Sequence, residues 1–150
     1  MRLWVQPRPG ARVMTHNLLV IEDDIVHGAV IRLVAEKAGF TVQVAPSIES
    51  AVECLRVGEF DCVTLDLSLG ELSGFEAMQA LDLLDCRMPI IIISGATDDR
   101  CGEAVALGKA LNLNVCPPLA KPVEFGALRN MLLAVAERSP ASTPSASLAV

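Results

Sequence analysis

The chain alternates short apolar runs with longer segments in which apolar residues recur at helical spacing, and this unit occurs five times. Short apolar runs followed by amphipathic helices are typical of βα units that build a parallel sheet. The five runs are rich in Val, Ile or Leu, as strands buried on both faces should be. The expected strands cover residues 17–21, 41–45, 60–65, 89–94 and 114–117. The alternation therefore predicts an α/β fold around a five-stranded parallel sheet.

The segments that follow these runs have the periodicity of helices. The first helix should begin after Asp24, whose side chain suits an N-cap, and should end near Gly39. Ser47 is the expected cap of the second helix. The remaining helices are expected at residues 47–57, 74–84, 98–112 and 123–137.

The two ends of the chain differ in composition from the part between them. Residues 1–15 contain two prolines and no periodicity, so we expect a flexible extension, with Met14 as an alternative start to Met1. Residues 138–150 are small, polar and proline-containing, which predicts a disordered tail. The segment 16–137 has a length that suits one domain.

Charge, cysteine content and apolar run length exclude several classes of protein. The net charge is -6 and no long run of Lys or Arg occurs, which disfavours direct nucleic-acid binding. The five cysteines are odd in number and lack C-x-x-C spacing, which favours reduced thiols in a cytoplasm. No apolar run approaches the ~20 residues that span a bilayer, and the N-terminus has no continuous apolar segment of the signal-peptide kind. We therefore expect no membrane association.

Residues capable of chemistry follow the expected strands, at the sheet edge where α/β folds bind their ligands. They are Glu22, Asp23 and Asp24 after the first strand, Asp66 after the third, Ser94 after the fourth and Lys121 after the fifth. Carboxylates that converge on one cleft repel each other unless a cation neutralises them. Oxygen ligands of this kind suit Mg²⁺, which commonly bridges protein carboxylates to a phosphoryl group.

A phosphoryl group at this edge would find both a nucleophile and stabilising groups. The Lys121 ammonium and the Ser94 hydroxyl could stabilise the oxygens of a transferring phosphoryl group. Asp66 would be the nucleophile and would form an acyl phosphate. The pattern predicts phosphoryl transfer to Asp66 beside Mg²⁺.

From about residue 17 to residue 135 the sequence resembles the receiver domains of two-component response regulators. LLVIEDD resembles the acidic motif of the first strand, PIIIISG the motif of the fourth strand, and LAKP the Lys-Pro motif. DCVTLDLSLGELSGFEAM resembles the phosphoacceptor segment, with Asp66 in the acceptor position. The resemblance implies a doubly wound, flavodoxin-like (βα)5 fold with strand order 2-1-3-4-5.

The resemblance also implies specific roles. Asp23, Asp66 and the backbone carbonyl of Ser68 would hold Mg²⁺, Glu22 would help through water, and the Lys121–Pro122 bond would be cis. A histidine kinase or a histidine phosphotransfer protein would phosphorylate Asp66. The chain would then be a signalling module rather than a turnover enzyme, and would act by altered binding to a downstream protein or as a homodimer.

Some residues depart from the family pattern and leave alternatives open. Pro118 stands where the family usually has an aromatic residue that switches with phosphorylation, so a degenerate receiver acting as a scaffold is one alternative. A phosphatase of the haloacid-dehalogenase type is another, although that family requires a second Asp where this chain has Ser68. The isolated His16 and His27 are expected to be exposed and to bind no metal.

Overall fold

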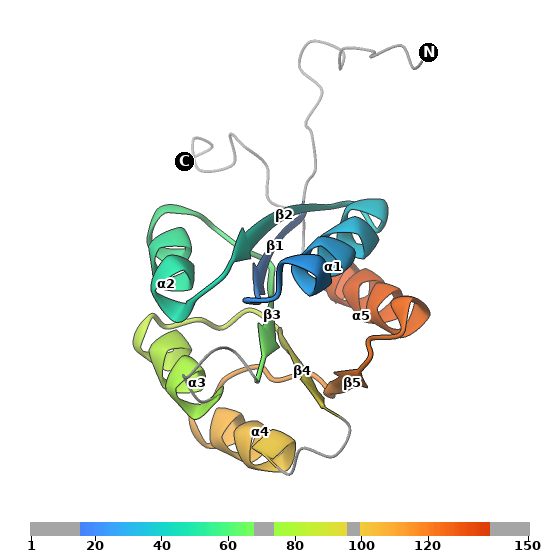
Figure 1. Cartoon of the computed structure of the whole chain (residues 1–150). Helices are drawn as coiled ribbons and strands as arrows, with labels where there is room; N and C mark the ends of the chain where they lie inside the picture. The colour runs from blue at the N-terminus through green and yellow to red at the C-terminus, as the bar shows by residue number, and fades with distance from the viewer. Residues whose placement is uncertain (1–15, 68–73, 96–99, 139–150) are drawn as a thin grey trace, which may run out of the picture.

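The computed structural model describes residues 16–67, 74–95 and 100–138, in which five strands alternate with five helices (Figure 1). The strands are β1 (His16–Ile21), β2 (Phe40–Ala45), β3 (Cys62–Asp66), β4 (Ile90–Gly95) and β5 (Leu119–Lys121). The helices are α1 (Ile25–Lys37), α2 (Ile48–Val57), α3 (Gly74–Leu83), α4 (Arg100–Ala110) and α5 (Phe125–Arg138). Among the described residues, no helix is both long and apolar enough to cross a membrane.

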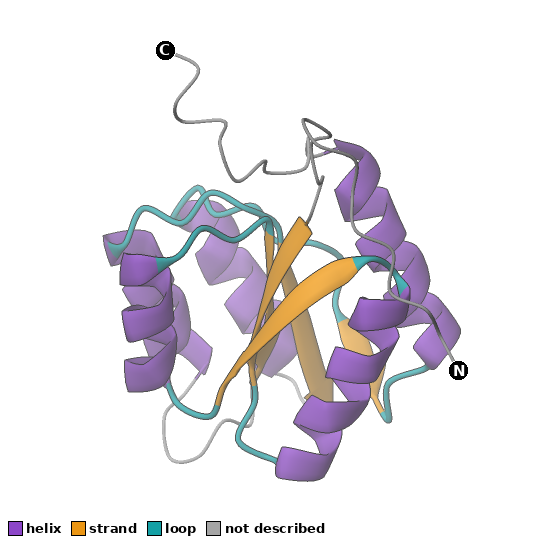
Figure 2. Ribbon diagram, turned by 90° about the horizontal axis from the view of Figure 1, so that it is seen from above, coloured by secondary structure: helices purple, strands orange, loops and turns teal. Residues whose placement is uncertain are grey.

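All strand pairs are parallel, and the sheet order is β2-β1-β3-β4-β5. This order confirms the predicted doubly wound fold. The twisted sheet lies between two layers of helices, with α1 and α5 on one face and α2, α3 and α4 on the other (Figures 1 and 2). Strand order reverses at β1 and β3, so their carboxyl ends lie side by side at the position where such folds bind ligands.

The core is divided by the sheet because successive strand side chains point to opposite faces. In β4, Ile90 and Ile92 pack in the cluster formed with α2, α3 and α4, whereas Ile91 and Ile93 pack in the cluster formed with α1 and α5. All four side chains are almost fully buried. Burial of one such side chain contributes about 1.5–3 kcal/mol, which explains the run of four isoleucines in β4.

Two predicted helix caps are present. The Asp24 carboxylate accepts the backbone N–H of His27 at 3.0 Å, and the Ser47 hydroxyl accepts that of Ser50 at 3.1 Å. Gly39 follows α1 with a φ of 95°, a backbone conformation that glycine adopts without the steric cost of a Cβ atom. Both caps fix where the chain leaves the sheet edge and turns into a helix.

The fifth strand was predicted at residues 114–117, and this prediction is wrong. Strand β5 is formed by Leu119–Lys121, and Val115 makes only an isolated bridge to Ile90. Pro117 and Pro118 lack the N–H groups that a strand donates, so regular pairing with β4 begins only after them.

Other element boundaries shift by a few residues. Strand β3 begins at Cys62 instead of residue 60 and includes Asp66 as its last residue. Helix α4 is described from Arg100 to Ala110, and the predicted start at residue 98 lies outside the described residues. Helix α5 extends to Arg138, the first residue of the predicted tail, whereas the remaining residues of both predicted end segments are not described.

Candidate functional site

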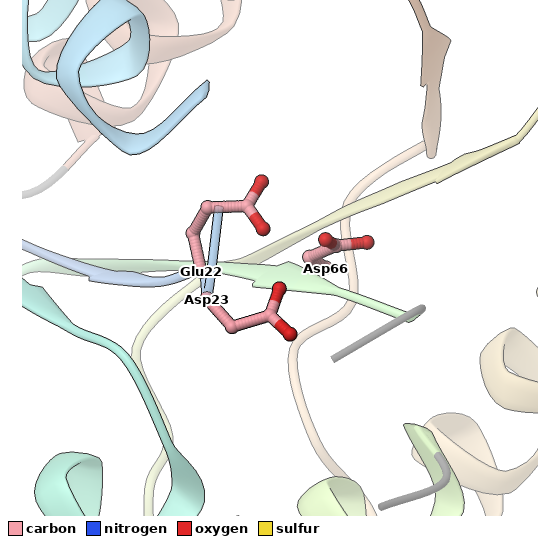
Figure 3. Close-up of side chains that lie close together, drawn as sticks. All are labelled: Glu22, Asp23 and Asp66. Carbon is pink, nitrogen blue, oxygen red and sulfur yellow. The ribbon is translucent and has the colours of Figure 1, made fainter. Parts of the chain in front are cut away.

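Three carboxylates gather at the carboxyl ends of β1 and β3 (Figure 3). One oxygen each of Glu22, Asp23 and Asp66 lies within 4.8 Å of the others. Glu22 and Asp66 are only 2% and 3% exposed, whereas Asp23 is exposed to solvent. The cluster therefore has two buried members and one that faces the surroundings.

The sheet fixes the backbone beneath the cluster. The N–H of Glu22 donates to the carbonyl of Ala45 at 3.0 Å, which continues the pairing of β1 with β2. The N–H of Leu67 donates to the carbonyl of Ile93 at 3.0 Å and holds the chain just after Asp66. A strand end anchored on both sides presents its carboxylate in a defined direction, which a flexible loop does not.

Lys121, the last residue of β5, reaches across to this cluster. Its Nζ lies 2.8 Å from Asp66 Oδ2 and 4.0 Å from Glu22 Oε1. The Lys121–Pro122 peptide bond is cis, as predicted. The Lys121 ammonium group thus lies close to two of the three carboxyl groups, Asp66 and Glu22.

The surroundings of Glu22 shift the pKa of its carboxyl group upward. Burial raises its pKa to about 7, assisted by a hydrogen bond and charge repulsion from Asp66. The contact with His27 and the charge of Lys121 act in the opposite direction but do not restore the ordinary pKa of 4.5. A divalent cation would favour the ionised form, because it supplies positive charge next to hard oxygen ligands. The donor set therefore fits Mg²⁺.

His27 was expected to be isolated and exposed, and the structure shows otherwise. Its side chain is 21% exposed, and its Nδ1 hydrogen-bonds to Glu22 Oε1. The signal that could have revealed this contact is its position in the first turn of a helix that starts directly after the acidic residues. His16 is half-buried, and its ring lies 5.6 Å from that of Phe40 between centroids.

Of the other residues singled out in the sequence, Ser94, Asp24 and Pro118 are described by the structure, whereas Ser68 is not. Ser94 is buried near the end of β4, where the register pairs Asp66 with Ile93, so Ser94 lies on the strand next to Asp66. Asp24 serves as the helix cap described above. Ser68 lies outside the described residues, and its carbonyl as a metal ligand stays a prediction. Pro118 is exposed in the segment before β5, so no aromatic side chain occupies that position.

Known proteins resemble this chain over the region that contains these residues. The sequence model of the response regulator receiver domain matches residues 18–133. The cell cycle transcriptional regulator CtrA of Caulobacter vibrioides is 31% identical over 82 residues, which cover 55% of this chain and 36% of CtrA. The autoinducer 1 sensor kinase/phosphatase LuxN of Vibrio campbellii is 26% identical over 128 residues, covering 85% of this chain and 14% of LuxN. The chain thus spans little more than a third, or less, of the length of these relatives.

Solved structures share the fold. The receiver domain of the sensor histidine kinase PA1611 from Pseudomonas aeruginosa superimposes with a TM-score of 0.67 at 24% identity. The match covers 80% of this chain and 96% of that domain, which holds a magnesium ion coordinated in its active site cleft.

Proposed function

This chain belongs to the response regulator receiver domain family, and on that premise we propose that Asp66 accepts a phosphoryl group in a Mg²⁺-dependent phosphorelay. The observation that carries the proposal is the 2.8 Å contact between Lys121 Nζ and Asp66 Oδ2 inside a cluster of three carboxylates. A nucleophilic carboxylate, a cation site and an ammonium group beside them are components that phosphoryl transfer uses.

The cation site would be formed by Asp23, Asp66 and the backbone carbonyl of Ser68, with Glu22 acting through water. Asp23 and Asp66 supply hard oxygen ligands on adjacent strand ends, and the raised pKa of Glu22 reflects its burial and the carboxyl group of Asp66 beside it. Bound Mg²⁺ would neutralise the charge that develops on the phosphoryl oxygens. The magnesium ion in the related receiver domain of PA1611 supports this assignment.

The residues of this chain would divide the remaining work. A carboxylate oxygen of Asp66 attacks phosphorus, so that an O–P bond forms as the N–P bond of a donor phosphohistidine breaks and the electron pair returns to the imidazole. The Lys121 ammonium, already beside Asp66, then stabilises a phosphoryl oxygen, and the Ser94 hydroxyl donates to another. Hydrolysis of the acyl phosphate later restores the carboxylate, so the chain acts as a signalling switch instead of a turnover enzyme.

The phosphodonor would be a histidine kinase or a histidine phosphotransfer protein, which the similarity to part of LuxN supports. Two large apolar side chains in the first turn of α1, Ile25 and Val26, are 89% and 72% exposed directly after the acidic cluster. A contiguous exposed apolar patch can mark a site of protein–protein interaction. We propose that the donor protein covers them while its phosphohistidine meets Asp66.

The signal would leave through altered binding to another protein or through homodimerisation. The five cysteines all lie in the described residues and form no disulfide, which supports a reducing compartment such as the cytoplasm.

The position of Pro118 favours one competing function, a scaffold that keeps the fold without phosphorylation, because the usual aromatic residue is absent there. The family match makes a haloacid-dehalogenase type of phosphatase the weaker alternative.

One experiment separates these functions. The chain is incubated with acetyl phosphate and Mg²⁺, and its intact mass is measured beside that of an Asp66→Asn variant. We expect one added phosphoryl group on the wild type and none on the variant. Absence of an Asp66-dependent adduct would favour the scaffold, and turnover of added phosphate esters would favour the phosphatase.

A further inference from the structure

The carboxylate of Glu22 is held by the beginning of α1 as well as by the sheet. Its Oε2 accepts the backbone N–H of Asp24 at 3.4 Å, and its Oε1 is hydrogen-bonded to His27 Nδ1. Asp24 in turn accepts the backbone N–H of His27 at 3.0 Å. Three residues therefore form a closed set of hydrogen bonds around one carboxylate of the acidic cluster.

This arrangement is a variant of the capping box. In the usual box, an acidic side chain at the third helical position reaches back to the N–H of the cap residue. Here the third position is His27, which has no carboxylate, and Glu22 from the strand end takes the N–H of Asp24 instead. The acid of the box thus belongs to the cluster, and the helix start determines the orientation of Glu22.

The imidazole of His27 acts on Glu22 as a directional donor. Its Nε2 is buried and has no hydrogen-bond partner within the described parts of the chain. A proton on Nδ1 donates to Glu22, whereas a proton on Nε2 would leave a buried N–H unpaired and Nδ1 without a hydrogen to give. The Nδ1–H tautomer therefore satisfies the contact at the lower cost.

Glu22 Oε1, the oxygen that His27 contacts, also lies close to Lys121. Lys121 Nζ lies 4.0 Å from it and 2.8 Å from Asp66 Oδ2. A lysine carries a compact charge on a flexible stem and can move between two carboxylates at these distances. Without the donor on His27, Glu22 would turn toward Lys121 and compete with Asp66 for its ammonium group.

We propose that His27 is a positioning residue of the phosphorylation site, which holds Glu22 for the cation site and leaves Lys121 paired with Asp66. The inference rests on the proposed function, because it assigns His27 a part in that reaction. Loss of an outer partner of a metal-binding group lowers metal affinity by about 10–100-fold. Since Glu22 would act through water, we expect the lower end, about tenfold weaker Mg²⁺ binding, when this contact is removed.

Three substitutions of His27 separate the hydrogen bond from side-chain volume. His27→Asn places an amide donor near the position of Nδ1, His27→Gln moves the same amide one carbon further, and His27→Leu has no donor. Mg²⁺ affinity is measured by calorimetry on the full, unphosphorylated chain, and the rate of acetyl phosphate adduct formation by intact mass. Thermal unfolding of each variant reports whether the fold is kept.

We expect His27→Asn to bind Mg²⁺ within about threefold of the wild type, and the Leu and Gln variants to bind about tenfold more weakly and to phosphorylate more slowly. Equal affinity of the wild type and a folded Leu variant would overturn the inference, as would weak binding by a folded Asn variant. If the Leu variant does not fold, the Mg²⁺ affinities of the Asn and Gln variants are compared, and equal affinities would overturn the inference.

The wild-type chain serves as the test of the premise. If it binds no Mg²⁺ and forms no Asp66-dependent adduct, the proposed function fails and the role of His27 fails with it. If the wild type does both and all three variants match it, only the role of His27 is refuted.

Discussion

In the absence of Mg²⁺, the free energy of unfolding of a Glu22→Gln variant, minus that of the wild type, should increase as the pH rises. The wild-type carboxyl group has its pKa raised to about 7 by burial and by Asp66. A group whose pKa is higher in the folded than in the unfolded state binds its proton more tightly in the folded state. Its contribution to stability is therefore present below pH 4.5 and is lost as pH rises through about 7.

The magnitude follows from the same two values. A pKa of about 7 in place of 4.5 corresponds to about 3 kcal/mol at 1.36 kcal/mol per unit. Glu22 is 2% exposed, and about 3 kcal/mol is therefore an upper bound, which any water that reaches the carboxyl group would lower. The Gln side chain does not ionise, so the free energy of unfolding of the variant minus that of the wild type should increase by up to about 3 kcal/mol between pH 4.5 and pH 8.

Urea unfolding at several pH values in the presence of EDTA measures this difference directly. Any constant effect of the changed hydrogen bonds cancels, because only the change with pH is compared. Glu59→Gln, at an exposed position before β3, is the matched control and should show no such change. Saturating Mg²⁺ should reduce the effect of Glu22→Gln, since a cation favours the ionised carboxylate. A difference that stays constant with pH would refute the raised pKa of Glu22 and its cause, burial beside Asp66.

Three further predictions concern the sheet edge and the helices around it. Gly108→Ala should lower the free energy of unfolding by about 1–3 kcal/mol, because the added Cβ would lie 2.4 Å from one side-chain atom and 2.7 Å from another. Urea unfolding measures the loss. Gly102→Ala is the control and should cause no loss, because no atom lies within 4 Å of a Cβ added there. The double change Ile25→Ser and Val26→Ser should slow phosphorylation by a phosphorylated donor protein but not by acetyl phosphate, and equal slowing with both donors would contradict a docking role. Lys121→Gln should slow adduct formation about 100-fold, because it removes a donor to the phosphoryl group. The same change should strengthen Mg²⁺ binding, because it removes a positive charge that repels the cation. Weaker Mg²⁺ binding in calorimetry would be inconsistent with this assignment.

The parallel sheet could be predicted because apolar strand segments alternate with helical patterns along the chain, whereas its strand order was implied by the resemblance to receiver domains. The acidic residues could be placed for a related reason, since the carboxyl ends of parallel strands meet at one edge. The fifth strand was misplaced because an apolar stretch looked like a strand, whereas Pro117 and Pro118 prevent regular pairing and shift it to Leu119–Lys121.

The role of His27 was missed for a different physical reason. Spacing along the sequence shows which groups share a helix face, but the contact of His27 with Glu22 depends on how tightly the chain turns at Asp24. That turn is set by hydrogen bonds from the backbone N–H groups of His27 and Asp24 to the side chains of Asp24 and Glu22, which periodicity does not encode. A histidine at the third position of a helix that follows acidic residues is the pattern that would have indicated the contact.

The short fifth strand also affects how the sheet can meet other chains. An unpaired strand edge is a template for adding a further strand, and proteins protect such edges with short strands and prolines. Strand β5 has three residues and follows Pro117 and Pro118, so this edge offers few backbone groups for pairing. Strand β2 at the opposite edge has six residues, with Thr41 and Gln43 exposed. Any self-association through strand addition should therefore involve β2, whereas the sheet edge formed by β5, which contains Lys121, is protected from it.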